Sequence, residues 1–213
     1  MHGGSSTETV KVEGAQPPST VDANLSADDL RAHEYSLLAV LLGRAPDQQV
    51  LHALAELKGD ATPLGLAHIH LAEAARTADP NEISREFFKL FIGVGRGELM
   101  PYGSFYLTGF LMEKPLARLR ADLLTLGIER APERREPEDN IAILCEIMAG
   151  MCSGTLETPP GADRQIFERH LRTWAPRFFA DLEMAEHARF YRHVGAIGRM
   201  FMEIEAEALA RAA

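Results

Sequence analysis

The chain has 213 residues, and 46% of them are hydrophobic, which is enough for one sizeable core. We therefore expect a single globular domain. The formal net charge of -9 argues against a nucleic-acid-binding protein, because phosphate recognition depends on a basic surface. An acidic chain of this kind favours a cationic partner.

The N-terminal segment predicts no structure of its own. Residues 1–25 are rich in Gly, Ser, Thr and Pro and bury too little apolar surface to offset the entropy of ordering. We expect a disordered tail there and one all-helical domain over residues 26–213. The N-terminus lacks the apolar core of a signal peptide, and the sequence has no span of eighteen apolar residues. These patterns predict a cytoplasmic protein without stable membrane insertion.

The two cysteines favour the same compartment. Cys145 and Cys152 lie in one predicted helix, where their separation corresponds to about 10 Å along the axis. A disulfide needs Cα atoms within about 7 Å of each other. Reduced thiols in a reducing cytosol are therefore the expected state.

Capping signals start the first two predicted helices. Ser26 and Asp29 have the spacing of a capping box, and helical apolar spacing then continues to Gly43. Asp47 predicts the start of a second helix. We expect this helix to close at Gly59, as a left-handed C-terminal residue would do.

Two further helices are predicted where a capping side chain precedes proline, at Thr62-Pro63 and at Asp79-Pro80. The second of them is rich in aromatic residues and runs into a glycine-bearing loop. After that loop, residues 104–112 predict a short apolar helix. Another helix begins at Pro115 and ends before Gly127.

The second half of the chain continues the helical pattern. A polar loop over residues 128–136 precedes a helix that is predicted to begin at Pro137 and to have one apolar face. Residues 166–174 form the next predicted helix, Pro176 restarts the chain, and a long last helix covers residues 190–204. The sequence shows no sustained two-residue alternation with β-branched residues. We therefore predict an all-α, single-domain bundle of about nine helices.

The most distinctive stretch is residues 87–111, where aromatic sequence flanks a loop with Gly93, Gly95 and Gly97. The loop has about ten residues, which exceeds the usual helix connection. In a structural interpretation, Gly93 caps the preceding helix and the other glycines occupy turns with positive φ. In a functional interpretation, the loop shapes a groove that a peptide approaches. A nucleotide fingerprint is incomplete, because both a preceding strand and a Gly-Lys-Ser/Thr sequence are missing.

The acidic residues Glu136, Glu138 and Asp139 crowd the start of a predicted helix. Carboxylates there stabilise a helix N-terminus by about 0.3–1 kcal/mol, and this ordinary role accounts for their presence. A second interpretation is that Asp139 faces a groove and accepts a guanidinium in a bidentate pair.

Histidines and hydroxyl groups do not form a recognisable catalytic pattern. His68 and His70 fall on opposite sides of one helix, whereas a zinc site needs three or four converging ligands. His170 and Trp174, four residues apart, are typical of packing residues. A nucleophile elbow is missing as well. We therefore predict no catalytic residue, no metal site and no cofactor.

Three motifs, in this order, resemble the TorD/DmsD family of redox-enzyme maturation chaperones. The first combines Leu90-Phe91, the three glycines, Pro101-Tyr102-Gly103-Ser104 and Tyr106. The second, residues 136–140, is similar to the family's Glu-Pro-x-Asp-His run. The third consists of Gln165, Phe167, His170, Leu171 and Trp174.

The resemblance implies an all-helical chaperone, not an enzyme. It would bind the twin-arginine signal peptide and the apo form of a molybdopterin-dependent oxidoreductase catalytic subunit, assist cofactor insertion and delay export. The implied peptide-binding residues are Leu90, Phe91, Pro101, Tyr102, Ser104, Tyr106, Glu138, Asp139 and Asn140, with Gly93, Gly95 and Gly97 as a loop or hinge. Asn140 replaces the family's histidine, and asparagine cannot carry the positive charge of an imidazolium.

Two other classes of function stay open. One is a guanine-nucleotide-binding or -hydrolysing helical protein that uses the Gly93–Gly97 loop, although it would lack a magnesium-binding acid and a Lys-Ser/Thr pair. The other is a metal-dependent helical hydrolase built on the scattered histidines. The oligomeric state is open between a monomer and a domain-swapped homodimer, because a glycine-bearing segment between long helices makes exchange inexpensive.

Overall fold

The computed structural model describes residues 25–129 and 135–211, which form an all-helical bundle. The prediction of an all-α fold is confirmed, whereas the predicted tail, apart from its last residue, lies outside the described residues. Two π-helical turns, η1 (Phe88–Ile92) and η2 (Phe167–Leu171), continue α4 and α8. In chain order the α-helices are α1 (Ala27–Gly43), α2 (Gln48–Ala55), α3 (Pro63–Arg76), α4 (Pro80–Phe87), α5 (Gly103–Thr108), α6 (Lys114–Thr125), α7 (Ile141–Ser153), α8 (Ala162–Ile166), α9 (Ala175–Met184) and α10 (Tyr191–Arg211).

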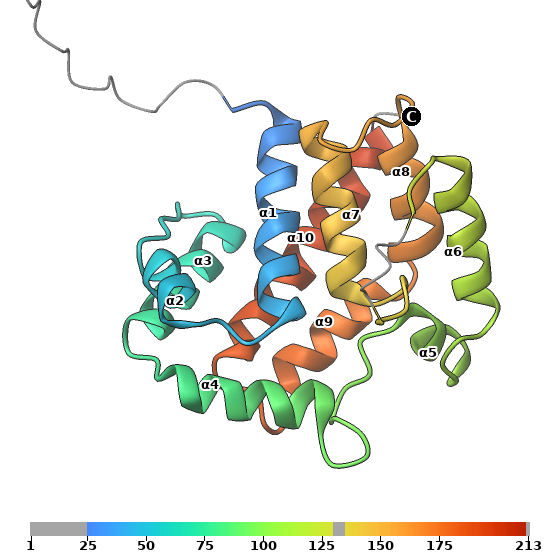
Figure 1. The fold of residues 1–213 in the computed structure, drawn as a ribbon. Coiled ribbons are helices and arrows are strands. Elements are labelled where there is room, and N and C mark those ends of the chain that lie inside the picture. The colour runs from blue at the N-terminus through green and yellow to red at the C-terminus, as the bar shows by residue number, and fades with distance from the viewer. Residues whose placement is uncertain (1–24, 130–134, 212–213) are drawn as a thin grey trace, which may run out of the picture.

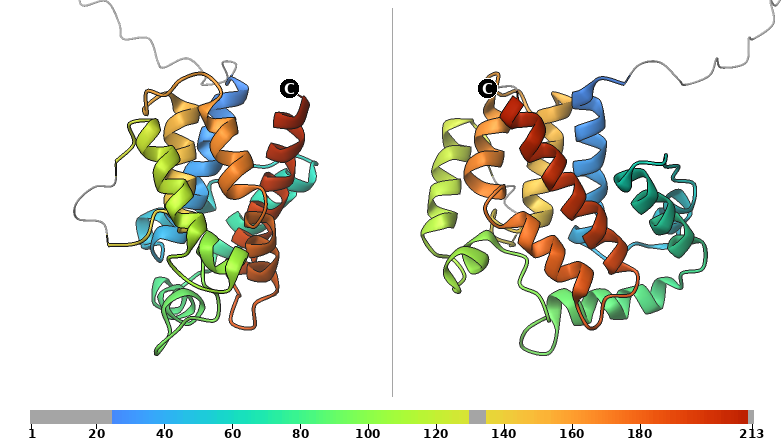
Figure 2. Two further views of the ribbon diagram at one scale, coloured as in Figure 1. Left: turned by 90° about the vertical axis from the view of Figure 1, so that its right-hand side faces the viewer. Right: turned by 180° about the vertical axis from the view of Figure 1, so that it is seen from behind.

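Three helices form the centre of the bundle. α7 packs along α1, and α10 runs behind them and packs along α9 (Figures 1 and 2). The α2–α3 hairpin lies on one side against α10, and α5 and α6 lie on the opposite side. α4 and η1 cross the end of the bundle at which α1 ends (Figure 1).

Side-chain caps start the early helices as predicted. Ser26 and Asp29 form the reciprocal capping box of α1. The side chains of Asp47, Thr62 and Asp79 each accept a hydrogen bond from a backbone N–H in the first turn of α2, α3 and α4. Local sequence alone fixes these starts, because each cap lies within three residues of its donor.

The predicted end of α2 is wrong. The helix ends at Ala55, and Gly59 does not have a left-handed φ. Gly59 instead lies so close to Gly65, in the first turn of α3, that an added Cβ would overlap its carbonyl group. Close approach of two backbones, and not helix capping, explains this glycine.

Three later boundaries also differ from the prediction. α5 is shorter than expected, because Gly109 adopts a φ of 83° and ends it. The predicted helix over residues 166–174 is divided into α8, η2 and a turn. The helix expected from Pro137 begins at Ile141, because Asn140 is its N-cap and the Asn140 side chain accepts from the N–H of Ala142 at 2.9 Å.

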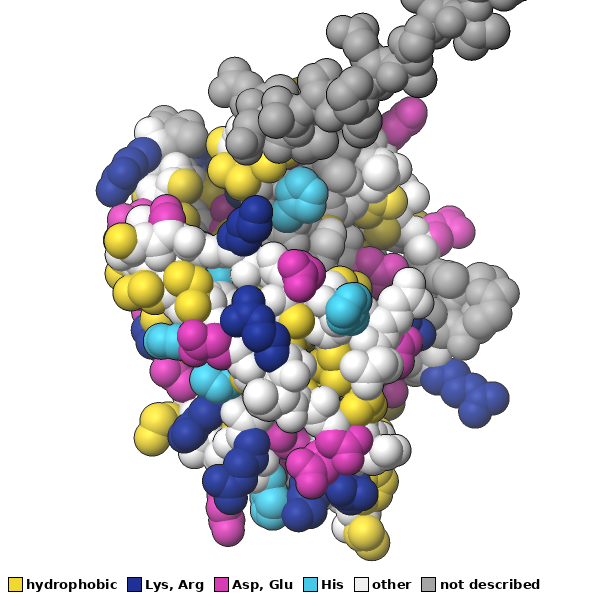
Figure 3. Space-filling model, turned by 90° about the vertical axis from the view of Figure 1, so that its left-hand side faces the viewer, with side chains coloured by type: hydrophobic (Ala, Val, Ile, Leu, Met, Phe, Trp, Pro, Cys, Tyr) yellow, Lys and Arg dark blue, Asp and Glu magenta, His cyan; other side chains and the backbone are white. Residues whose placement is uncertain are grey.

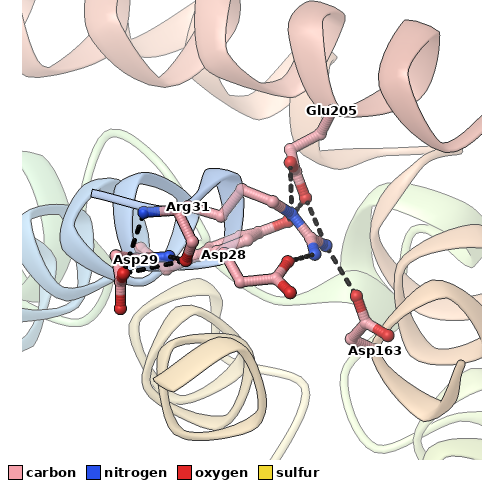
Figure 4. Close-up of polar contacts among 7 residues, drawn as sticks. Asp28, Asp29, Arg31, Asp163 and Glu205 are labelled. Carbon is pink, nitrogen blue, oxygen red and sulfur yellow. Dashed lines mark hydrogen bonds and ion pairs between the residues drawn. The ribbon is translucent and has the colours of Figure 1, made fainter. Parts of the chain in front are cut away.

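A buried ion cluster joins α1, α8 and α10 (Figure 4). The Nε and Nη2 atoms of Arg31 donate to the two carboxylate oxygens of Glu205 at 2.8 and 3.0 Å, and Nη2 also lies 2.7 Å from Asp163. The hydroxyl of Tyr35 donates to Glu205 at 2.9 Å. Because Glu205 is only 1% exposed, these partners replace the water that its carboxylate loses on folding. The cluster fixes the N-terminal end of α1, away from η1.

Candidate functional site

The glycine loop closes the C-terminal end of η1. Gly93 has a φ of 63°, and its N–H donates to the carbonyl oxygen of Phe88 at 2.7 Å. At the far end of the loop, the N–H of Leu99 donates a hydrogen bond to the carbonyl oxygen of Leu90 at 2.8 Å. The loop is therefore a helix cap, and the structural interpretation of Gly93 is confirmed.

The other two loop glycines differ from each other. Gly95 has a φ of 89° and open space where a side chain would lie, next to Val94, which is 98% exposed. The prediction of a turn with positive φ is wrong for Gly97, which lacks one; its added Cβ would instead lie 2.6 Å from the carbonyl oxygen of Leu90, so close backbone packing explains this glycine. The loop thus follows a helix C-terminus, whose partial negative charge disfavours phosphate. Its geometry gives the guanine-nucleotide alternative no support.

The chain after the loop crosses the segment that precedes α7. Tyr102 and Asn140 form an isolated antiparallel bridge, and the N–H of Ile141 donates to the carbonyl oxygen of Pro101 at 2.9 Å. The first and second motifs, whose nearest residues are thirty positions apart in sequence, are therefore joined by backbone hydrogen bonds.

Asp139 is buried at this crossing and holds α5 in place. Its backbone oxygen accepts from the N–H of Gly103 at 2.9 Å, and its Oδ2 accepts from the N–H of Ser104 at 2.7 Å. An added Cβ on Gly103 would lie 3.0 Å from Nε1 of Trp174, so glycine allows this indole of the third motif to approach. Parts of all three motifs thus meet in one buried cluster.

Asp139 and Tyr102 line different cavities. Asp139, which is 3% exposed, lines a cavity of about 310 Å³ that is also walled by Arg118, His170 and Trp174. Its Oδ1 atom has no hydrogen-bond partner among the described residues. The two side chains are neighbours across the crossing but do not share a groove, so the assignment of Asp139 as a guanidinium acceptor stays a prediction.

A groove of about 470 Å³, which we call the motif groove, opens between the end of α1, η1 and the start of α7. Leu90 and Ser104 are fully buried, and Tyr106 and Glu138 line other cavities. Four of the predicted site residues line the motif groove: Phe91, Pro101, Tyr102 and Asn140.

The motif groove combines an apolar wall with charged groups. Phe87 and Phe91 pack edge to face with ring centroids 5.0 Å apart, and Ile92 beside them is 53% exposed. The hydroxyl of Tyr102 donates to Oε2 of the exposed Glu136 at 2.6 Å. Burial, followed by this carboxylate, raises the pKa of Tyr102 to about 12, so the phenol is a neutral donor near neutral pH.

Sequence reasoning missed the part of the groove that comes from α1 and α7. Val40 and Arg44 near the end of α1, and Glu146 of α7, line it together with Arg135. The sequence held one signal, because Val40 is an apolar residue that lies outside the apolar face of its helix. In the structure Val40 is 45% exposed. The groove therefore carries two carboxylates, Glu136 and Glu146, and two guanidinium groups.

Tyr106 belongs to an aromatic cluster that ties α5 to α9. Its ring centroid lies 5.7 Å from that of Trp174 and 5.9 Å from that of Phe178. Its hydroxyl donates to Asp181 at 3.0 Å, and burial together with this carboxylate raises its pKa. These contacts give Tyr106 a packing role.

The histidines do not converge on a metal site. The described residues contain no group of three or more His, Cys, Asp or Glu side chains that could hold a metal ion. His68 pairs with Glu34 at 3.0 Å, and the rings of His70 and His193 lie 6.4 Å apart. Figure 3 shows the side of the bundle that carries α2 to α4, where histidine, acidic and basic side chains are interspersed. The metal-hydrolase alternative therefore has no ligand set in the described part of the chain.

The described residues define an all-helical bundle in which parts of the three sequence motifs meet. The model of the nitrate reductase delta subunit family matches residues 57–180, and the chain belongs to that family. Over 139 residues the chain is 25% identical to chaperone protein TorD of Vibrio atlanticus and 30% identical to chaperone protein TorD of Aliivibrio salmonicida. Each comparison covers 61% of this chain and 65% of the relative, which is just under two thirds of the relative's length.

A solved structure has a similar fold. It comes from Archaeoglobus fulgidus, is described as a redox enzyme maturation protein, and matches 87% of this chain and 99% of its own with a TM-score of 0.58 and 19% identity. The resemblance to the TorD family that the three motifs predicted is confirmed. Within residues 25–129 and 135–211, no helix is long and apolar enough to span a membrane.

Proposed function

We propose that this chain is a cytoplasmic, non-catalytic chaperone for one molybdopterin-dependent oxidoreductase catalytic subunit. It binds the twin-arginine signal peptide and the apo form of that subunit, assists cofactor insertion and delays export. Membership of the nitrate reductase delta subunit family and the TorD relatives support this role. The observation that carries it is the motif groove, in which an aromatic wall and an exposed carboxylate come from the segments of the first two motifs.

The chemistry of a twin-arginine leader fits that groove. Such a leader has a cationic pair followed by an apolar stretch. Its apolar side chains would bury surface against Phe91 and Ile92 at about 25 cal/mol per Å². Tyr102 donates to Oε2 of Glu136, and among the described residues no other hydrogen bond is recorded to this exposed carboxylate, which can accept a guanidinium. Glu136 therefore sets chiefly orientation and association rate, and affinity should fall only moderately with salt.

The test is a calorimetric titration of the chain with the twin-arginine leaders of the molybdoenzymes of its source organism. We expect at least one leader to bind, and Ile92→Asp to weaken that binding by about tenfold, because a charge enters the apolar wall. Leu30→Asp is the matched control, since both side chains are 53% exposed but Leu30 lies at the start of α1. Failure of every leader to bind, or equal affinity of the two variants, would contradict the proposal.

A further inference from the structure

A hollow that is separate from the motif groove lies between the last turn of α4, η1 and the glycine loop. Its volume is about 790 Å³, and the glycine loop projects there from the end of the bundle (Figure 1). We call it the basic hollow, because Arg85, Lys89 and Arg96 line it, whereas Glu98 is the one carboxylate among its described lining residues. None of these residues lines the motif groove.

The carboxylates next to the basic hollow are already bound within the chain. Glu98 accepts from the backbone N–H groups of Glu186 and His187 at 2.6 and 3.1 Å, and it lies 2.8 Å from the His187 ring. Glu86 accepts from three successive backbone N–H groups at the start of α10, at 2.7 to 3.1 Å. Both side chains therefore fasten the connection between α9 and α10 and form no ion pair with the cations of the hollow.

The three cations of the hollow are exposed and weakly paired. Arg85 lies 3.9 Å from Glu82, in a pair whose side chains are 67% and 72% exposed, and such a pair contributes little. Lys89 and Arg96 form no ion pair with any described residue, and the Arg96 guanidinium lies 5.8 Å from the centroid of the Phe105 ring. A cationic hollow on a chain with a net charge of -9 favours an anionic occupant.

Exposed apolar side chains border the same cations. Phe88 is 43% exposed and Val94 is 98% exposed, and both line the basic hollow. The carbonyl oxygens of Phe88 and Lys89, at the end of η1, already accept from backbone N–H groups of the loop at 2.7 and 3.0 Å. They therefore leave the cations free to bind an added carboxylate. This chemistry fits a short peptide segment that combines carboxylates with an apolar side chain.

We propose that the basic hollow binds an acidic segment of the apo catalytic subunit, outside its twin-arginine leader. This inference rests on the proposed function and adds a second contact between the chaperone and the subunit. The leader carries a cationic pair, which the basic hollow would repel. Because η1 contributes side chains to both the motif groove and the basic hollow, a subunit whose leader occupies the groove lies next to the hollow.

A larger polyanion fits the basic hollow less well. A nucleic acid or an anionic membrane would extend beyond the hollow, over the surface that gives the chain its net charge of -9. The attraction of three cations is screened over a Debye length of about 8 Å at physiological ionic strength. A short acidic segment stays within that distance, so the hollow favours a peptide over a polyanion.

The first experiment measures the affinity of the chain for the leaderless apo subunit of the enzyme whose leader binds best. We expect Lys89→Glu to weaken this binding by about tenfold, because a carboxylate would then face the acidic segment. Lys58→Glu makes the same charge change at an exposed lysine outside the hollow and the motif groove, and affinity should stay within about twofold. Lys89→Arg retains the cation and should bind with wild-type affinity.

Leader affinity, measured on the same variants, separates this inference from the proposed function. Lys89→Glu should bind the isolated leader as tightly as the wild type does. If no leader binds the wild-type chain, the proposed function fails and this inference fails with it. If a leader binds but the leaderless subunit does not bind, or binds the wild type and Lys89→Glu equally, the function stands and the assignment of the hollow is overturned. Equal losses of leader and subunit affinity in Lys89→Glu would assign Lys89 to the fold and also overturn it.

A second experiment identifies the contact directly. A carbodiimide condenses an amine with a carboxylate that touches it, so Lys89 should form an amide bond with an Asp or Glu side chain of the leaderless subunit. Lys89→Arg should lose this cross-link while it keeps its affinity. A cross-link from Lys89 to a second copy of this chain, instead of to the subunit, would assign the hollow to a dimer contact and overturn the proposal.

Discussion

The motif groove and the buried cluster around Asp139 share one backbone crossing but differ in what their side chains contact. In the cluster, Asp139 and Trp174 are 3% and 1% exposed, and the carboxylate of Asp139 bonds the backbone of its own chain. In the groove, Tyr102 is half-buried and its partner Glu136 is exposed. Residues of the same motif therefore have different roles. Asp139 stabilises the fold, whereas Glu136 lies on an exposed surface.

This difference separates two kinds of substitution. Changes in the buried cluster should lower the free energy of unfolding, and changes in the groove should lower leader affinity. The variants below test that separation in order of expected effect.

The largest expected effect is far from both regions. Arg31→Ala leaves the carboxylate of Glu205, which is 1% exposed, without its guanidinium, and we expect a loss of about 3–5 kcal/mol in unfolding free energy. Urea denaturation measures it. Arg211→Ala is the control, because that arginine is 80% exposed and its pair with Glu207 should contribute less than about 0.5 kcal/mol. The folded fraction of Arg31→Ala should bind leader with wild-type affinity. A lower leader affinity of the folded variant would contradict the separation between residues that stabilise the fold and residues that bind the leader.

Removal of the Asp139 carboxylate comes next. Asp139→Ala leaves the buried N–H of Ser104 without an acceptor, so we expect about 1–3 kcal/mol less stability. Asp139→Asn keeps an oxygen acceptor and should lose less. Equal unfolding midpoints for Asp139→Ala and the wild type would show that the cluster does not depend on this bond.

The smallest expected effect is that of pH. Burial, and then the neighbouring His70 and Arg192, lower the pKa of His193 in the folded state. The unfolded chain therefore takes up this proton first, so stability should be constant above about pH 6.5 and fall as the pH decreases below it. Urea midpoints across this range should show a shallower pH dependence for His193→Gln. An unchanged dependence would contradict the burial of His193. None of the described residues that line the motif groove is a histidine, so leader affinity should not follow the same curve.

Sequence reasoning succeeded where the decisive contact is local. Ser26 and Asp29 lie within one helical turn, so their capping box was predictable. The start of α7 was mispredicted although its cap is also local, since Asn140 accepts from the N–H of Ala142. The contact that the sequence could not show is the bridge between Asn140 and Tyr102, almost forty residues away in sequence. Helical periodicity predicted the all-α class for the same local reason.

The candidate site was only partly predictable. The motif resemblance named Phe91, Pro101, Tyr102 and Asn140, which do line one groove. It also named Leu90 and Asp139, which are buried at 0% and 3% exposure, and the motifs alone do not distinguish buried from exposed positions.

The most direct test of this division compares Glu136→Gln with Asp139→Asn, measuring leader affinity and unfolding free energy for both. Glu136→Gln should weaken leader binding by about threefold, the effect of an exposed charge, and leave stability unchanged. Asp139→Asn should leave leader affinity unchanged. The opposite result, a loss of binding in Asp139→Asn at full stability with Glu136→Gln unaffected, would place the arginine acceptor in the buried cavity and contradict the motif groove as the recognition site.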